Sequence, residues 1–431
     1  MKRPTNALIG LLLITASSFA VHAEDGYRLW LRYDKVRNTQ RLTEYREALK
    51  SFVVEGSSPT MLAARHELHI GLGGLLGRDI AEETRVHHSG VLVAADFRTS
   101  KSLAGLDLKS DLDKIGGEGY LILSRKLDGK ETTIITANSD VGVLHGVFGF
   151  LRLLQTEQDI HNLHIVSFPR IKLRILDHWD NLNGTIERGY AGFSIFDWHT
   201  LPIYLKPRYT DYARADASIG IDGTVLNNVN ADPLILSHEY LVKAAALAGV
   251  FRPYGIKLYL CANFDAPIML GKLKSADPMS AQVQTWWKEK AAEIYKLIPD
   301  FGGFLVKANS EGQPGPRDYG RTQADGANLL ADALKPYGGV VMWRAFVYSY
   351  DAKDRAKQAY EEFTPLDGAF ANNVLLQVKK WAAGLSAPGT VQPSLWRNAE
   401  DEYDDGIPDH DGVSGTRDQQ RLPRSPVQGD P

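Results

Sequence analysis

GFLVKANSEGQPGP, residues 303–316, is the stretch of this 431-residue chain that best indicates its fold. An aliphatic run ends in a lysine, a few small and polar residues and a glutamate, and a Gly/Pro-rich loop then prevents the strand from continuing. A barrel strand that carries a carboxyl group to its carboxyl end has this form. We therefore expect Lys307 and Glu311 to lie together, where the lysine can hold an anionic group and the glutamate can move a proton.

The same strand-then-helix unit recurs along residues 166–379. Strands are expected at 173–176, 224–228, 257–262, 303–307, 340–343 and 373–378, and helices at 238–248, 281–297, 324–334 and 353–363. Repeated βα units predict a parallel sheet, and their number favours a (β/α)8 barrel over an open sheet. Because only six strands can be counted, this TIM barrel is expected to be incomplete.

Residues 24–165 indicate a smaller α/β domain in front of the barrel. Helices are expected at 57–76 and 141–154, the second capped by Asp140, and strands at 90–97, 119–123 and 131–136, with a hairpin turn at 127–129. The glycines of residues 71–74 miss the spacing of a dinucleotide-binding loop and fall inside an expected helix. No cofactor is therefore expected in this domain.

The first 23 residues have the pattern of a secretory signal peptide. Lys2 and Arg3 precede an apolar run at 7–16, and small residues flank His22 at the expected cleavage site. This run is too short to span a bilayer comfortably, so we expect a secreted or periplasmic protein, with an uncleaved membrane anchor as the alternative. The net charge of −3 gives no support for a nucleic-acid partner, and the single cysteine, Cys261, is expected to be buried and unpaired.

Polar side chains follow all six expected barrel strands. They are Asp177, His178, Trp179 and Asp180 after the first, Asn227, Asn228 and Asn230 after the second, Asn263 after the third, Lys307 and Glu311 after the fourth, Arg344 after the fifth and Lys379 after the sixth. A single polar residue in such a place is usually a turn or a helix cap. Polar groups at every strand end are better explained by a lined pocket, because active sites of these barrels lie at that face.

The residue types at this face suggest sugar-acid chemistry. Trp179 offers an apolar face to a pyranose ring, and Lys307, Arg344 and Lys379 can hold a carboxylate through charge-assisted hydrogen bonds. Glu311 can then serve as a general acid for the leaving glycosidic oxygen. The alternative for Glu311 is an ion pair with Lys307 and no further role.

Five sequence blocks occur in a characteristic order: DHWDNLNGTIERGYAG at 177–192, LNNVNA at 226–231, VKANSEGQPGP at 306–316, VVMWRAFVY at 340–348 and PLDGAFANNVLLQVK at 365–379. They resemble consecutive blocks of the α-glucuronidases of glycoside hydrolase family 67, which remove 4-O-methyl-glucuronic acid from xylan fragments. The resemblance implies that Glu311 is the catalytic acid, that Lys307, Arg344 and Lys379 contact the uronate or its surroundings, and that Trp179 and Val229 line the pocket. It also implies an inverting hydrolase of xylan degradation that acts on aldouronic acids, needs no metal or organic cofactor and can form a family-type homodimer.

The resemblance ends after Lys379, and we hypothesise that residues 380–431 are an out-of-frame, disordered tail. A reading frame one base later can convert residues 399–412 into PKTNMMMEFQITME, which resembles the next block of the family. The two carboxylates that activate water would then stand at the positions of Gly384 and Gly412, and barrel strands seven and eight would be lost. On this hypothesis the chain is impaired in hydrolysis and poorly soluble; the rival interpretation is a native acidic, disordered tail.

Two other functions remain open at the level of sequence. One is a uronic-acid-binding remnant that keeps the cations without hydrolysis. The other is a hexosaminidase-like glycosidase, but such an enzyme would place an Asp-Glu pair at the end of the fourth strand, where this chain has Ser310 and Glu311.

Overall fold

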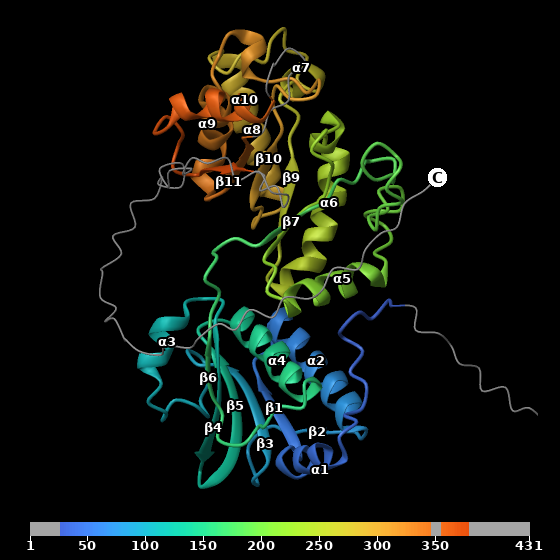
Figure 1. Ribbon diagram of the computed structural model, residues 1–431, viewed down its shortest axis with the longest axis vertical. Helices are drawn as coiled ribbons and strands as arrows, with labels where there is room; N and C mark the ends of the chain where they lie inside the picture. Colours follow the sequence, from blue (N-terminus) through green and yellow to red (C-terminus); the bar gives the residue numbers. More distant parts are fainter. Residues whose placement is uncertain (1–25, 346–354, 379–431) are drawn as a thin grey trace, which may run out of the picture. The chain divides into compact units, whose positions relative to one another are not determined.

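The computed structural model describes residues 26–345 and 355–378 (Figure 1). The expected signal peptide, Lys379 and the tail at 380–431 lie outside these residues. Within the described part of the chain, no helix has both the length and the apolar character needed to cross a membrane.

The N-terminal part of the chain is built on a six-stranded sheet in the order β2-β1-β3-β5-β4-β6. Its strands are β1 Ser51–Glu55, β2 Ala81–Glu82, β3 Val91–Asp96, β4 Tyr120–Leu127, β5 Lys130–Ala137 and β6 His164–Ser167. The pairs β1/β2, β1/β3 and β3/β5 are parallel, whereas β4 is antiparallel to β5 and β6. The expected hairpin is confirmed, and its turn residues Asp128 and Gly129 have φ angles of 49° and 78°, as a two-residue turn of type I′ requires.

Helices cover both faces of this sheet. They are α1 Thr39–Ala48, α2 Pro59–Leu76, α3 Lys109–Ile115 and α4 Asp140–Gln155. In β3, Leu92 and Ala94 pack with α1, α2 and α4, while Val91 and Val93 face the other way, toward α3. The strand is therefore buried on both sides, which explains its unbroken apolar sequence.

Two details of these helices bear on the sequence predictions. The expectation that Asp140 caps α4 is wrong: Ser139 has the extended backbone of a cap, and its Oγ accepts a hydrogen bond from the Gly142 N–H at 3.0 Å. The glycines of residues 71–74 lie inside α2, as expected. A Cβ at Gly71 would lie 2.6 Å from Leu151 Cδ1, so the missing side chain allows α2 and α4 to pack closely.

The second sheet confirms the incomplete barrel. All six expected strands form, and they pair in parallel and in chain order, β12-β11-β10-β9-β8-β7. The strands are β7 Ile175–Asp177, β8 Gly223–Val225, β9 Lys257–Cys261, β10 Gly303–Val306, β11 Val340–Arg344 and β12 Val374–Gln377. β8 ends earlier than predicted because the Asn227 side chain replaces the backbone ladder, accepting from the Cys261 N–H at 2.8 Å and donating to the Cys261 carbonyl oxygen at 3.1 Å.

Helices follow these strands on one side of the sheet (Figure 1). They are α5 Pro207–Ser218, α6 His238–Phe251, α7 Ala266–Met269, α8 Ala281–Leu297, α9 Gln323–Leu334 and α10 Arg355–Phe363, with 3-10 turns at Pro233–Leu236, Arg252–Tyr254, Pro316–Tyr319, Lys335–Tyr337 and Thr364–Leu366. Alternate strand residues face these helices, as Phe304 and Val306 do in β10. Leu305 belongs to a second apolar cluster on the opposite face, which is the inside of the barrel. Because side chains alternate along a strand with a period of two residues, Lys307 lies on the same inner face as Leu305.

The sheet is curved into a half-barrel. Trp179 follows the first strand, β7, and Arg344 ends the fifth strand, β11, yet the Arg344 guanidinium carbon lies 5.6 Å from the centroid of the Trp179 ring. In a flat sheet, four strand spacings would separate them by about 19 Å. The contact therefore crosses the inside of the barrel.

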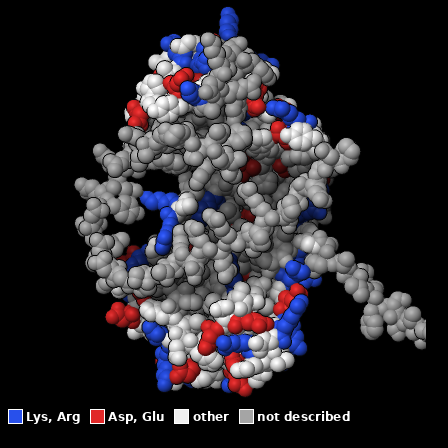
Figure 2. Space-filling model, in the orientation of Figure 1, with Lys and Arg blue, Asp and Glu red and all other residues white. Residues whose placement is uncertain are grey.

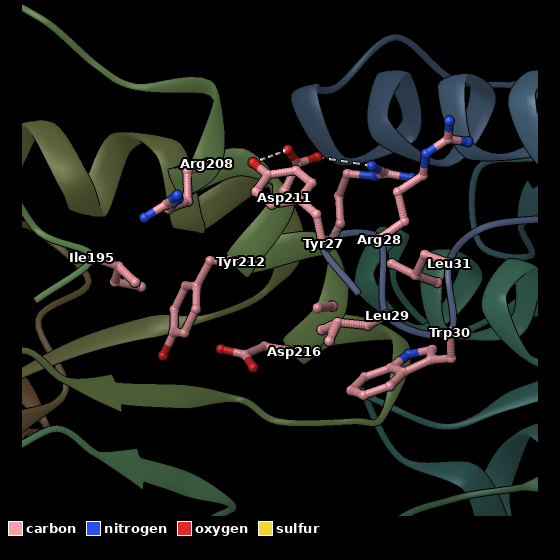
Figure 3. Close-up of a pocket in the computed structure, with 12 residues that line it drawn as sticks. Tyr27, Arg28, Leu29, Trp30, Leu31, Ile195, Arg208, Asp211, Tyr212 and Asp216 are labelled. Atoms are coloured by element: carbon pink, nitrogen blue, oxygen red, sulfur yellow. Dashed lines mark hydrogen bonds and ion pairs between the residues drawn. The ribbon is translucent and has the colours of Figure 1, made fainter. Parts of the chain in front are cut away.

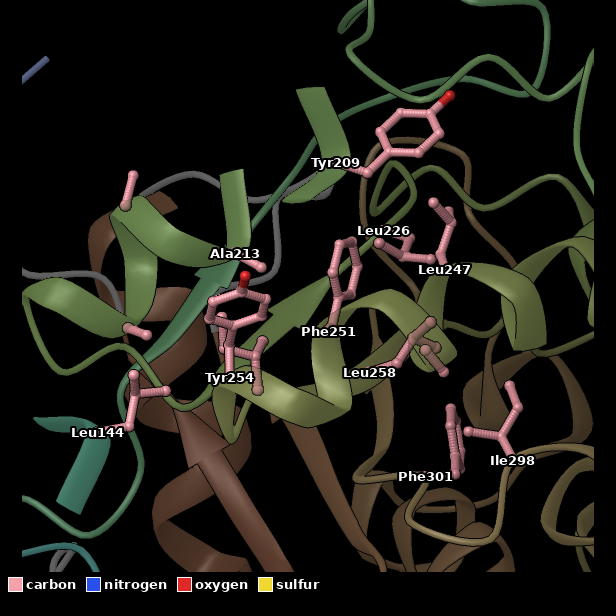
Figure 4. Close-up of a cluster of buried hydrophobic side chains, with 14 of the residues drawn as sticks. Leu144, Tyr209, Ala213, Leu226, Leu247, Phe251, Tyr254, Leu258, Ile298 and Phe301 are labelled. Atoms are coloured by element: carbon pink, nitrogen blue, oxygen red, sulfur yellow. The ribbon is translucent and has the colours of Figure 1, made fainter. Parts of the chain in front are cut away.

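The helices on the two sheets share an apolar core and a buried ion cluster. Leu144 of α4 belongs to the same cluster as Phe251 and Leu258 of the barrel (Figure 4). Beside it, Arg214 of α5 forms a bidentate pair with Glu67 of α2, with both N···O distances at 2.9 Å. The Glu67 side chain is 1% exposed.

Candidate functional site

The loop after β10 brings Lys307 and Glu311 together, as the sequence predicts. Lys307 is 5% exposed, and its Nζ donates to Glu311 Oε2 at 2.5 Å and to Asn230 Oδ1 at 2.7 Å. Both Asn309 and Glu311 have positive φ angles, 48° and 49°, a conformation that costs energy for residues other than glycine. The turn therefore holds the glutamate back against its lysine rather than letting the strand run on.

These contacts set the charge state of the pair. The hydrogen bond from Lys307 lowers the pKa of Glu311, while burial lowers the pKa of the Lys307 ammonium. The ion pair that the sequence left open as the simplest role of Glu311 is thus present. A second cation lies beside it, because Arg188 Nη2 is 3.6 Å from Glu311 Oε1.

Across the barrel, Arg344 ends β11 and Trp179 follows β7. Together with Lys307 and Glu311, these two residues form what we call the rim. Arg344 is 6% exposed and lies over the indole ring. Asp177, at the end of β7, is close to both: burial raises the pKa of Asp177 to about 6, and the Arg344 charge and a hydrogen bond with Trp179 only partly offset that effect. Asp177 Oδ1 is buried without a hydrogen-bond partner among the described residues.

The loops after β7 and β8 are tied together beneath this rim. The backbone N–H of Asn228 donates to the Asp180 carbonyl oxygen at 2.8 Å. Its side-chain nitrogen, Nδ2, donates to Asn181 Oδ1 at 3.0 Å and to the Glu187 carbonyl oxygen at 3.1 Å. Val229 is 2% exposed and packs in the same inner apolar cluster as Trp179. The backbone around the rim is therefore well supported.

Other predicted strand-end residues have structural partners. His178 points toward α5, where its Nε2 shares a 2.8 Å hydrogen bond with the Tyr212 hydroxyl. Asn263 donates to the Ala231 carbonyl oxygen at 2.9 Å. Cys261 is buried, as expected.

The structure thus unites Lys307 with Glu311 and Trp179 with Arg344, whereas Lys379 lies outside the described residues. The sequence predicts no role for Arg188, which lies in a loop, and it indicates Asp177 only as one of several polar strand-end residues. The alternation of Ile175 and Asp177 along β7 is the signal that could have placed the Asp177 carboxyl inside the barrel.

A cavity of about 330 Å³ lies elsewhere, between residues 27–31 and α5 (Figure 3). Asp216 lines it, and burial raises the pKa of Asp216 to about 6. None of the rim residues lines this cavity, so it is separate from the candidate site. Within the described ranges, no three His, Cys, Asp or Glu side chains gather as metal ligands would, and on the face shown in Figure 2 basic and acidic side chains are interspersed.

The structure is thus a partial barrel with charged side chains at the carboxyl ends of its strands. Comparison with known proteins shows the family to which it belongs. Residues 29–150 match the glycosyl hydrolase family 67 N-terminus, and residues 153–393 match the glycosyl hydrolase family 67 middle domain. The chain belongs to glycosyl hydrolase family 67. The middle-domain match continues past Lys379, where the block-by-block resemblance ends.

Curated relatives are similar over most of this chain. Alpha-glucuronidase A of Emericella nidulans is 37% identical over 401 residues, which are 89% of this chain and 46% of the relative. Alpha-glucuronidase of Hypocrea jecorina is 39% identical over 392 residues, 86% of this chain and 45% of the relative. The chain therefore spans about half the length of these relatives. Among solved structures, a GH138 enzyme targeting pectin rhamnogalacturonan II aligns over 76% of this chain and 38% of its own, with a TM-score of 0.46 and 15% identity.

Proposed function

We propose that this protein is an α-glucuronidase scaffold whose site is built for the α-1,2 bond between (4-O-methyl-)glucuronic acid and xylo-oligosaccharides, but that this chain is impaired in hydrolysing it. The observation that carries the proposal is the carboxyl group of Glu311 held between Lys307 and Arg188 on the barrel rim. Family membership and the names of the curated relatives support it. Export through the expected signal peptide would bring such an enzyme to plant-derived aldouronic acids outside the cell.

In this proposal the substrate's carboxylate binds to the cations and its ring lies on the apolar wall. Lys307 and Arg344 are both at least nine-tenths buried, so their charges are poorly hydrated and bind an anion strongly. Trp179 and Val229 supply the apolar wall for the pyranose. Lys379 is proposed to complete the cation set from the end of the sixth strand.

Glu311 is proposed to be the general acid. In the free protein the Lys307 hydrogen bond lowers the pKa of Glu311 and favours the ionised form. A substrate carboxylate that binds Lys307 weakens this hydrogen bond and adds a negative charge nearby, and both changes raise the pKa of Glu311. Substrate binding thus promotes uptake of the proton that Glu311 then gives to the leaving glycosidic oxygen.

Inversion also needs a carboxylate that activates water on the opposite face of the sugar. On the frame-change hypothesis those groups would stand where this chain has Gly384 and Gly412. We therefore propose that this chain binds uronate but is impaired in hydrolysis. Its partners are then aldouronic acids, and a family-type homodimer is proposed only for a full-length form.

Calorimetry and a glycosidase assay test these statements separately. We expect glucuronate to bind and glucose not to, and Lys307→Met to weaken glucuronate binding roughly 10- to 100-fold, because one charge-assisted hydrogen bond is lost. Lys243→Met is the control, since Lys243 pairs with Glu239 on α6 away from the rim. Equal affinities for glucuronate and glucose would refute uronate recognition. Normal release of 4-O-methyl-glucuronate would refute impairment, and unchanged hydrolysis by Glu311→Gln in a frame-corrected chain would refute the acid role.

A further inference from the structure

The loop between β7 and α5 contains a tightly hydrogen-bonded hairpin at residues 180–194. Bridges join Asp180 to Ile186 and Thr185 to Phe193. The Ile186 N–H donates to the Gly192 carbonyl oxygen at 3.1 Å, and the Ser194 N–H donates to the Gly184 carbonyl oxygen at 2.9 Å. Each of these glycines has a positive φ, so the sequence suits the turns that the hairpin makes.

This ordered hairpin presents two aromatic side chains to solvent. Tyr190 is 77% exposed and Phe193 is 85% exposed. Burial of a large aromatic ring lowers the free energy of the system. Two exposed rings fixed on one short hairpin are therefore typical of a recognition surface.

The hairpin is joined directly to the proposed acid. The Glu187 N–H donates to the Trp179 carbonyl oxygen at 2.8 Å, and the next residue, Arg188, lies 3.6 Å from Glu311. Tyr190 is two residues farther along, which places its Cα within about 7 Å of that of Arg188. The turn of the hairpin that carries Tyr190 therefore lies on the side of the rim where Glu311 stands, and Phe193 follows on the returning strand, paired with Thr185.

We propose that Tyr190 and Phe193 form a stacking shelf for the neutral pyranose units of the leaving oligosaccharide. This inference rests on the proposed function, in which the cations hold the uronate. A general acid must face the leaving group, because it protonates the oxygen of the bond that breaks. The sugars beyond that oxygen carry no charge, so aromatic faces rather than further cations suit them.

The test compares glucuronate with glucuronate linked to xylobiose, by calorimetry on the full chain. The variants are Tyr190→Ala, Phe193→Ala and the pair together, with Tyr360→Ala as a matched control because Tyr360 is 60% exposed on α10. We expect each shelf variant to weaken the oligosaccharide roughly 3- to 10-fold and to leave glucuronate unchanged. An equal affinity of wild type and the double variant for the oligosaccharide would overturn the shelf.

Failure of the proposed function would look different. If wild type binds neither glucuronate nor glucuronate linked to xylobiose, saturation-transfer NMR with xylotriose tests the shelf alone. A transfer signal that is present in wild type and lost in the double variant supports the shelf. A signal that is absent from wild type, or equal in both proteins, overturns it. Analytical ultracentrifugation of wild type and the double variant tests the rival occupant of the shelf, which is a second copy of this chain. Self-association that disappears with the two rings would show that they contact a second copy of the chain and not a sugar.

Discussion

Replacing Asp177 by asparagine should remove a pH-dependent destabilisation of the barrel. Burial raises the pKa of Asp177 to about 6 from an ordinary value of 3.8. Below pH 3.8 the carboxyl group is protonated in both the folded and the unfolded protein, and the folded protein has its full stability. As the pH rises through 6, the buried group must ionise in the folded protein, and this part of the free energy of unfolding is lost. The difference between the two values corresponds to about 3 kcal/mol of unfolding free energy at neutral pH.

Urea unfolding of wild type and Asp177→Asn between pH 4 and 8 measures this effect. The free energy of unfolding of the variant, relative to wild type, should rise by about 2.5 kcal/mol from pH 4 to pH 8, because the unfolded-state carboxyl is already partly ionised at pH 4. Asp197→Asn is a control of opposite sign, because the hydrogen bond from Lys206 lowers the pKa of Asp197 to about 2. That variant should lose stability at neutral pH. A difference between Asp177→Asn and wild type that does not change with pH would refute the reasoning.

Three further outcomes are expected. Glucuronate should bind more tightly at pH 5 than at pH 7.5, because ionised Asp177 competes with the uronate carboxylate for the same guanidinium. Calorimetry on Asp177→Asn should show this dependence reduced to the part that proton uptake by Glu311 contributes, and an unaltered dependence would contradict the assignment. Glu67→Gln should lower the free energy of unfolding by about 1.5–3 kcal/mol in urea titrations, since it removes the charge-assisted hydrogen bonds to Arg214 and leaves that guanidinium only Asp211 as a counter-charge; a loss below about 1 kcal/mol would be the wrong result. Gly303→Ala should cost about 3 kcal/mol, because its Cβ would lie 1.9 Å from the Val340 carbonyl oxygen at a φ of 140°, and a melting temperature equal to that of wild type would exclude such a clash.

The sequence predicted the barrel strands well because each is a short apolar run bounded by turn residues. β9 and β10 illustrate this, since residues 258–261 and Gly303–Val306 are buried and the polar residues Asn263 and Lys307 follow closely. Helix α5 was not predicted. Its buried face consists largely of small and aromatic residues, among them Tyr209, Ala213 and Ala217, so the spaced aliphatic side chains that mark an amphipathic helix are absent from it.

The candidate site was predictable where its contacts are local in sequence. Lys307 and Glu311 are four residues apart, and a single strand end brings them together. The contact of Trp179 with Arg344 depends on the curvature of the whole sheet, which no local pattern encodes. Arg188 lies in a hairpin whose shape follows from backbone hydrogen bonds and glycines, so its approach to Glu311 could not be read from spacing.

The ring of Trp179 under the Arg344 guanidinium gives this chain a natural optical reporter. A cation close to an indole changes its emission, and this cation arrives only when the first and fifth strands have both joined the curved sheet. Trp179 fluorescence, isolated by substituting the other tryptophans, should therefore report the moment in refolding at which β7 and β11 join the curved sheet. If the proposed function holds, a sugar acid bound between the strand ends would favour the curved sheet over a flatter one, and the same fluorescence would detect that preference.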